Sequence, residues 1–297
     1  MVTNGAKQAI YNLFQVLLND GDEVIIPAPY WLSYPQMVRL AGAKPVFLNS
    51  SAEDGFKINI QDLKSKISPK TKFIIINSPN NPTGRVMPKE ELLQIAELVR
   101  ENKNINILSD EIYELILKKE FKHLSLASLA TDLKERIFII NGFAKGWAMT
   151  GWRVGYLVGQ KDVIKASSAL QSQSTSNVCS FVQRGALEAL KVNPEFFLEI
   201  NSHYDLRREV LYKGLKNIEG LFIYPPNGAF YAFPRLPNNS MTSVEFCKRI
   251  LNDYGLVVVP GKPFGDDQCI RISCASSKEK ILDGLIRLEK AILNYYF

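Results

Sequence analysis

Residues 137–153 read IFIINGFAKGWAMTGWR, and this stretch decides the fold that we expect. Its first four residues form an apolar run, which is typical of a short strand buried on both faces. A glycine-containing turn follows and carries Lys145 and Arg153. Because ligands of α/β proteins gather beyond the carboxyl ends of parallel strands, the segment predicts a binding site as well as a strand.

Apolar runs of the same kind recur along the chain before and after this segment. We expect strands at residues 23–26, 44–48, 72–77, 105–109, 136–141 and 155–159. Apolar side chains at helical spacing predict helices at 5–18 and 89–102, and a long helix-rich stretch at 161–217. Strands that alternate with helices predict an α/β fold whose mainly parallel sheet is covered by helices.

The pattern changes after Gly220. We expect strands at residues 221–224, 229–233, 256–259 and 269–273, and helices at 243–253 and 277–295. Two turns rich in proline and glycine separate these strands. The sequence therefore predicts a smaller C-terminal α+β domain at 206–297, behind a large domain at 1–205.

Composition excludes several classes of protein. The 297 residues carry a net charge of +6, but lysines alternate with acidic residues, so solvated helix faces explain the charge better than a nucleic-acid site. The apolar runs are far shorter than the roughly 20 residues that span a bilayer. The first residues do not resemble a signal peptide, so we expect a cytoplasmic protein without a membrane partner.

The cysteines and histidines predict no metal site. Reduced, buried thiols are expected for the four scattered cysteines, Cys179, Cys247, Cys269 and Cys274. The two histidines, His123 and His203, are expected at the surface or in helix packing. A nicotinamide dehydrogenase is also disfavoured, because no Gly-x-Gly-x-x-Gly turn follows the first strand.

Polar motifs follow three successive predicted strands. Residues 77–84 read NSPNNPTG, residues 110–113 read DEIY, and the third motif contains Lys145. Each motif alone has a structural explanation, as a turn, a helix cap or a surface lysine. Their recurrence at three strand ends favours one shared site.

In this order the three motifs resemble the signatures of fold-type I, class I/II aminotransferases, which depend on pyridoxal phosphate. The similarity extends from Val2 to the last predicted helix. The segment 141–156 is most similar to that of prokaryotic aspartate aminotransferases. The match begins well inside the family's usual sequence, so we expect the family's N-terminal segment to be absent.

The resemblance implies roles around the cofactor ring. Lys145 matches the amine that joins the cofactor aldehyde, and Asp110 matches the carboxylate that keeps the pyridine nitrogen protonated. Asn81 and Tyr113 match the hydrogen-bond donors to the phenolic oxygen. By the same resemblance Lys145, Asp110 and Tyr113 are the expected catalytic residues.

The resemblance also implies binding residues for the ring face and the phosphate. Trp31 matches the aromatic side chain that stacks on the ring, although a plain core residue competes with this interpretation. Gly5, Ala6 and Lys7 open a helix whose free N–H groups suit a phosphate, and Lys7 is equally consistent with a helix surface. Arg153 matches the phosphate-binding arginine.

Substrate binding is expected from Arg271, Trp31 and Asn81. Arg271 corresponds to the arginine that holds the α-carboxylate, and a structural arginine at a strand end is the alternative. Residues 227–231 also resemble a family segment, but a glycine-driven turn explains them equally well.

We therefore expect amino-group transfer between an L-amino acid, with aspartate first, and a 2-oxo acid, with 2-oxoglutarate first. The alternatives are an aromatic or prephenate aminotransferase, a carbon–sulfur lyase, or a silent binding protein or inactive fragment that retains the fold. Family members are homodimers, so a homodimer is expected. Residues 171–177 either approach the neighbour's site or form a plain polar loop.

Overall fold

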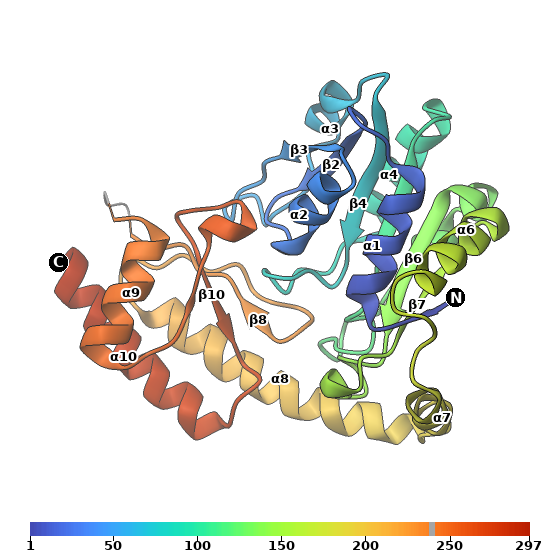
Figure 1. Ribbon diagram of the computed structural model, residues 1–297. Helices are drawn as coiled ribbons and strands as arrows, with labels where there is room; N and C mark the ends of the chain where they lie inside the picture. The colour runs from blue at the N-terminus through green and yellow to red at the C-terminus, as the bar shows by residue number, and fades with distance from the viewer. Residues whose placement is uncertain (238–240) are drawn as a thin grey trace.

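The computed structural model describes residues 1–237 and 241–297, and a seven-stranded sheet forms its larger part (Figure 1). The strand order is β1-β7-β6-β5-β4-β2-β3. The strands are β1 (Val2–Thr3), β2 (Glu23–Pro27), β3 (Lys44–Leu48), β4 (Thr71–Asn77), β5 (Asn106–Asp110), β6 (Ile137–Gly142) and β7 (Gly155–Val158). The five strands from β2 to β6 pair in parallel, and β7 runs antiparallel to β6 and β1. The expected mainly parallel α/β sheet is confirmed.

Helices bury both faces of this sheet. Because successive side chains of a strand point to opposite sides, each central strand contributes to two apolar cores. In β2, Val24 and Ile26 join one apolar core and Ile25 joins the other. The first core is covered by α1 (Ala6–Leu17), α2 (Ser33–Leu40) and α6 (Lys161–Ser172). The second is covered by α3 (Ile60–Lys66), α4 (Lys89–Glu101) and α5 (Leu126–Leu129).

The long amphipathic helices agree with the sequence pattern to within a residue, whereas shorter elements were not predicted. The pattern missed α2, α3, α5 and the two-residue β1. Pro35 lies in the first turn of α2, where proline is tolerated because the first N–H groups have no helical partner. In the sequence alone, the same proline indicates that no helix continues through this position.

The C-terminal part is built on a three-stranded sheet of order β8-β10-β9. Its elements are α8 (Pro194–Asn217), β8 (Tyr231–Ala232), α9 (Ser243–Tyr254), β9 (Val259–Pro260), β10 (Ile270–Ser273) and α10 (Lys278–Tyr296). The preceding helix α7 (Ser180–Ala189) packs instead on Phe143 and Val154 of the larger part. In Figure 1, α8 runs below both sheets. Residue 205 lies inside this continuous helix, and the division into 1–205 and 206–297 stays a prediction.

Two predicted C-terminal strands are wrong in extent. Residues 221–224 form no strand, and Phe222 makes only an isolated bridge to Arg235. Pro225 and Pro226 follow directly and lack the N–H groups that a ladder needs. The strand expected at 256–259 begins at Val259 instead.

Two of the sequence motifs pack on each other. The carbonyl oxygen of Gly84 accepts hydrogen bonds from the N–H groups of Asn227 (2.9 Å) and Gly228 (2.8 Å). A Cβ atom at Gly84 would lie 2.8 Å from the carbonyl oxygen of Tyr231, and its φ is +71°. Glycine is therefore required where the loop after β4 meets the segment before β8.

None of the helices in residues 1–237 and 241–297 is long and apolar enough to cross a membrane.

Candidate active site

A cleft of about 330 Å³ lies where the loops after β4, β5 and β6 approach the smaller sheet. It is lined by almost every side chain that the sequence predicted for a site: Ala6, Lys7, Trp31, Asn81, Asp110, Tyr113, Lys145, Arg153 and Arg271. Gly5 does not line it but directly precedes α1. The structure thus brings together residues that are far apart in the sequence.

Asp110 ends β5 and is buried at the floor of the cleft. Its Oδ2 accepts a hydrogen bond from the Tyr34 hydroxyl (2.6 Å), and its Oδ1 accepts one from the Ile112 N–H (3.2 Å). Burial raises the pKa of Asp110 to about 6, and the negative charge of Glu111 adds to the rise, whereas both hydrogen bonds and Lys145 lower it. The carboxyl is thereby ready to ionise fully when a cation binds beside it.

Lys145 lies in the loop between β6 and the short 3₁₀ helix η2 (Thr150–Trp152). Its Nζ is 5.5 Å from the centre of the Phe230 ring. Burial lowers the pKa of Lys145, and the positive charges of Arg153 and Arg271 lower it further. A lysine in such surroundings is a better nucleophile and base at neutral pH than an exposed one.

Arg153 and the start of α1 form an anion site. Arg153 has a left-handed backbone, with φ of 54°, and its Nη1 donates to the carbonyl oxygen of Thr150 (2.9 Å). A Cβ atom at Gly5 would lie 2.6 Å from Arg153 Nη2. Only glycine therefore leaves enough space for the guanidinium beside the start of α1. The first-turn N–H groups of Ala6 and Lys7 have no carbonyl partner within the helix. A phosphate group fits this combination of N–H groups and a guanidinium.

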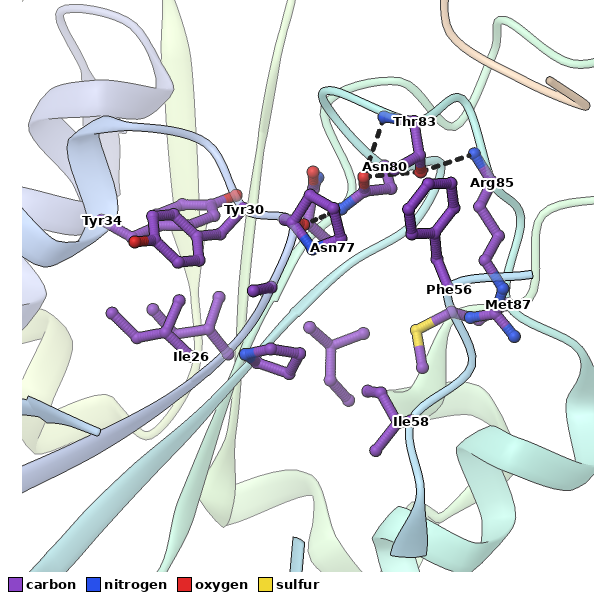
Figure 2. Close-up of a pocket in the computed structure, with 15 residues that line it drawn as sticks. Ile26, Tyr30, Tyr34, Phe56, Ile58, Asn77, Asn80, Thr83, Arg85 and Met87 are labelled. Carbon is purple, nitrogen blue, oxygen red and sulfur yellow. Dashed lines mark hydrogen bonds between the residues drawn. The ribbon is translucent and has the colours of Figure 1, made fainter. Parts of the chain in front are cut away.

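The loop after β4 holds Asn81 through a chain of side-chain contacts. Asn77 accepts a hydrogen bond from the Asn81 N–H (2.9 Å) and donates to the carbonyl oxygen of Asp110 (3.0 Å). Asn80 accepts from both the N–H (3.1 Å) and the hydroxyl (2.7 Å) of Thr83, and Figure 2 shows this turn. The Asn-Asn-Pro-Thr-Gly motif is thus folded on itself and tied to the end of β5.

A second cavity, of about 40 Å³, lies behind this loop (Figure 2). Tyr30, Tyr34, Phe56 and Met87 contribute to its walls. It is too small for an amino acid. Of the residues predicted for the site, none lines this cavity.

Arg271 reaches the cleft from β10. Its Nη1 donates to Asn81 Oδ1 (3.0 Å), and its guanidinium lies over the rings of Tyr231 (4.5 Å) and Phe264 (4.8 Å). Among the ion pairs of the described residues, none involves Arg271, and its Nε is buried without a hydrogen-bond partner. Aromatic faces hold the guanidinium without neutralising it, so its charge is available to a carboxylate.

Tyr113 and Trp31 complete the walls. The hydroxyl of Tyr113 is 3.1 Å from that of Tyr231, and burial raises the pKa of Tyr113 well above its ordinary value. Trp31 packs edge-on against Tyr34, at 5.3 Å between ring centres, and Lys7 Nζ lies 5.0 Å from the indole. Trp31 therefore both contacts the core and lines the cleft, and its stacking role stays a prediction.

Sequence reasoning missed three residues of this site. Tyr34 contacts Asp110, Asn77 holds Asn81, and Tyr231 packs against Arg271. The sequence offered no helical signal for Tyr34, because Pro35 follows it directly and Trp31 lies before the start of α2 at Ser33. Tyr231 belongs to the segment 227–231, for which a turn alone is a sufficient explanation at the level of sequence.

The polar loop at 171–177 contacts the α1 end of its own chain. Thr175 Oγ1 accepts hydrogen bonds from Asn4 Nδ2 (3.2 Å) and Gln8 Nε2 (2.7 Å). The loop is therefore anchored close to the anion site. Both of its expected roles stay open.

The cysteines and histidines depart in part from expectation. All four cysteines are free thiols, but Cys179 is exposed and Cys247 is half-buried, so only Cys269 and Cys274 are buried as predicted. His203 is an exposed residue of α8. His123 lies in no helix and contacts Glu111 instead, because the chain between β5 and α5 folds back on the end of β5.

Comparisons with known proteins agree with this geometry. The family model described as "Aminotransferase class I and II" matches residues 1–288. A probable aspartate/prephenate aminotransferase of Rickettsia felis is 44% identical over 98% of this chain and 74% of its own length. An aspartate aminotransferase of Bacillus subtilis is 42% identical over 98% of this chain and 75% of its own length.

Solved structures share the fold. The aspartate aminotransferase from Rhizobium meliloti has a TM-score of 0.94 at 35% identity and covers 98% of this chain, with 76% of its own length matched. An aromatic aminotransferase from Pyrococcus horikoshii has a TM-score of 0.94 at 38% identity, over 99% of this chain and 79% of its own length. The chain spans about three quarters of the length of these relatives.

Proposed function

The chain belongs to the class I and II aminotransferases, which use pyridoxal phosphate, and we propose that it transfers the amino group of aspartate to 2-oxoglutarate. The observation that carries this proposal is the charge of the cleft. Four cationic side chains line it, Lys7, Lys145, Arg153 and Arg271, against one acidic side chain, Asp110. This charge suits an anionic cofactor and substrates that carry carboxylates. The choice of aspartate is supported by relatives named aspartate aminotransferase, such as that of Bacillus subtilis.

Bound pyridoxal phosphate supplies an electron sink for charge that develops at the substrate Cα. In the proposed arrangement Arg153 and the first-turn N–H groups of α1 hold its phosphate. Asp110 holds the proton of the ring nitrogen, while Asn81 and Tyr113 hydrogen-bond to the phenolic oxygen. Trp31 covers one face of the ring. These assignments are supported by the position of each side chain in one cleft.

Two residues act on the substrate. Arg271 binds the α-carboxylate, since its guanidinium is held by two rings and an amide rather than by an acid. Lys145 would take the proton from Cα of the amino acid, and in the reverse half-reaction it would deliver a proton to Cα of the oxo acid. Its lowered pKa supports this exchange, because a neutral amine is needed at the start.

The test is a spectroscopic titration of the purified protein reconstituted with pyridoxal phosphate. Aspartate, glutamate, phenylalanine and cysteine are added separately, and absorbance of the bound cofactor is followed. Changes with the two acidic amino acids alone would support the proposal. Changes with phenylalanine alone would favour an aromatic aminotransferase. Turnover of aspartate with prephenate as the oxo acid, in place of 2-oxoglutarate, would favour the function in the name of the Rickettsia felis relative. Release of pyruvate and sulfide from cysteine would favour a lyase.

We also propose that the active form is a homodimer in the cytoplasm. Four apolar side chains in α7, directly after it and in α8 are exposed: Phe181 (73%), Leu187 (51%), Leu190 (61%) and Leu198 (68%). Large apolar side chains exposed in this number are typical of a surface that a partner covers. The free cysteines fit a reducing compartment. Light scattering of the wild type and of Phe181→Glu would test the dimer, and a monomeric wild type would contradict it.

A further inference from the structure

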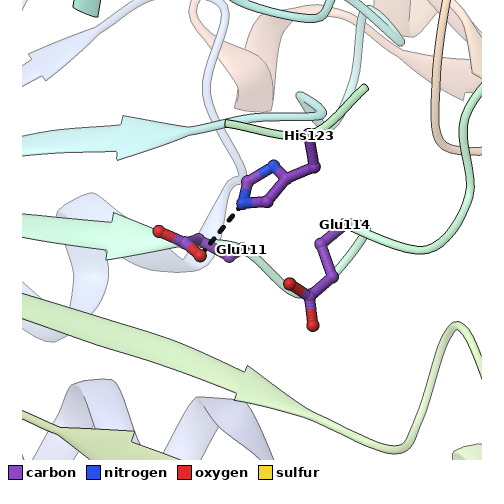
Figure 3. A group of neighbouring side chains, drawn as sticks. All are labelled: Glu111, Glu114 and His123. Atoms are coloured by element: carbon purple, nitrogen blue, oxygen red, sulfur yellow. Dashed lines mark hydrogen bonds and ion pairs between the residues drawn. The ribbon is translucent and has the colours of Figure 1, made fainter. Parts of the chain in front are cut away.

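A second cluster of ionisable side chains lies beside the cleft but does not line it. It consists of Glu111, Glu114 and His123, and Figure 3 shows them at the end of β5. Their ligating atoms lie within 4.8 Å of one another, a spacing that would suit a metal ion. The hydrogen bonds of Glu111 point to a different role.

Both carboxylate oxygens of Glu111 are already occupied. Oε1 accepts from the hydroxyls of Ser109 (2.8 Å) and Ser125 (2.9 Å), and Oε2 lies 3.0 Å from Nε2 of His123. The side chain of Glu111 is only 5% exposed and that of His123 only 13%. Three donors around one buried carboxylate match its ionised form, which accepts and does not donate.

The imidazole of His123 is oriented by this single contact. Its Nδ1 is buried and has no hydrogen-bond partner among residues 1–237 and 241–297. Figure 3 shows the ring turned with Nε2 toward Glu111. Nε2 is therefore the nitrogen that donates, and the pair is fixed in one geometry.

The cluster joins the ends of the two strands that carry the proposed catalytic residues. The N–H of Glu111 donates to the carbonyl oxygen of Ile140 in β6 (2.9 Å). Glu114 Oε1 accepts from Asn141 Nδ2 (2.7 Å), shortly before Lys145 in the chain. The end of β5 at Asp110 and the start of the Lys145 loop are thus held together from behind.

We propose that Glu111 and His123 are a positioning pair for Asp110: His123 fixes Glu111, and the fixed negative charge of Glu111 sets how tightly Asp110 and the cofactor ring nitrogen share a proton. The proposal rests on the role of Asp110 proposed above. Besides His123, the titratable groups that face Glu111 are Asp110, Glu114 and Tyr156. Their combined charge is negative, so the charge of Glu111 makes the electrostatic potential at Asp110 more negative.

The first test removes the charge and keeps the shape. In Glu111→Gln the amide oxygen still accepts from Ser109 and Ser125. Loss of a negative charge one residue from Asp110 should lower the apparent pKa of the bound cofactor, followed by absorbance against pH, by on the order of half a unit or more. Glu120→Gln, an exposed acid of the same connection, is the control and should leave that pKa unchanged.

The second test compares two replacements of His123. His123→Gln keeps an N–H donor for Glu111, whereas His123→Ala removes it. The cofactor dissociation constant should rise in the alanine variant, by up to about tenfold, because Glu111 is then no longer held beside Asp110, and it should return to wild type with glutamine. This comparison stands even where Glu111→Gln fails to fold, which thermal melting would reveal.

Unchanged absorbance titration in folded Glu111→Gln would overturn the role of the charge. Equal weakening by glutamine and alanine at position 123 would overturn the role of the donor. A wild-type protein that shows no absorbance of bound cofactor would instead refute the proposed function itself, so the two failures are distinguishable.

Discussion

The hydroxyl of Tyr34 lies 2.6 Å from Oδ2 of Asp110 and donates to it. This hydrogen bond connects α2 to the end of β5 beneath the cleft. Because a buried carboxylate is stabilised by each donor that it keeps, the contact favours the ionised form that a protonated ring nitrogen requires. The Tyr34 hydroxyl therefore belongs to the proposed cofactor site, although it does not reach the substrate in the proposed arrangement.

Tyr34→Phe should weaken binding of pyridoxal phosphate by about 10- to 100-fold, because a hydrogen bond to a charged group contributes ~1.5–3 kcal/mol. The dissociation constant is measured by fluorescence titration of the cofactor-free protein. Tyr11→Phe, on the exposed side of α1, is the matched control and should bind normally. Equal affinity of the Tyr34 variant and wild type would show that the contact does not support Asp110.

Asp110→Asn should change how the stability of the cofactor-free protein depends on pH. Burial raises the pKa of Asp110 from an ordinary 3.8 to about 6, so the folded protein binds more protons than the unfolded chain between these values. The resulting stability is fully present below about pH 4 and is lost as the pH rises through 6. The asparagine side chain does not titrate, so the variant does not lose this stability. At pH 7 its free energy of unfolding should exceed that of wild type by up to ~3 kcal/mol.

Urea denaturation across pH 4–8 measures this difference. Asp20→Asn, an exposed position, should leave the profile of the wild type unchanged. Parallel profiles of Asp110→Asn and wild type would contradict the raised pKa of Asp110.

Gly5→Ala should lower cofactor affinity about 10- to 100-fold, since the new methyl group would displace Arg153 from the anion site. Gly21→Ala separates this effect from backbone strain. Gly21 has nearly the same φ (+80° against +82°), but a Cβ atom added there would have no other atom within 4 Å. Isothermal titration with pyridoxal phosphate should show lower affinity in Gly5→Ala alone. Equal losses of affinity in both variants would show that displacement of Arg153 is not the cause.

Arg271→Lys should raise the KM for amino acid and oxo acid about 100-fold while cofactor binding stays normal. Lysine cannot form the planar two-point contact with a carboxylate, nor lie flat between the rings of Tyr231 and Phe264. Arg249→Lys is the control, because Arg249 also stacks on a ring, that of Tyr295 at 4.3 Å, but is exposed on α9. A normal KM in steady-state kinetics of the Arg271 variant would remove this residue from the substrate site.

Much of the larger sheet could be predicted because its strands are buried on both faces. The run at 72–77 appears as the buried strand β4 (Thr71–Asn77), and the helix expected at 89–102 appears as α4. The smaller sheet was harder, since the segment 221–224 has a strand-like composition but no partner strand for its whole length. Pairing over long sequence separations is not encoded in a local pattern.

The site residues that were predicted are those whose side-chain chemistry is explicit in a motif. Asp110 ends β5, Lys145 and Arg153 lie in the segment between β6 and β7, and the structure places all three around one cleft. Tyr34 and Tyr231 could not be found in this way, because an aromatic residue in an apolar helix or beside a turn is usually a packing residue. Their importance depends on which partner they meet across the chain.

The two hydrogen bonds that Gly84 accepts from Asn227 and Gly228 have a mechanical consequence. Arg271 donates to Asn81 from the neighbouring strand, so the same seam is joined at a third point. The Asn81 loop is thus fixed on one side to the end of β5, through Asn77, and on the other side to the C-terminal part. A shift of the C-terminal part relative to the larger sheet would therefore have to break hydrogen bonds on one side of this loop.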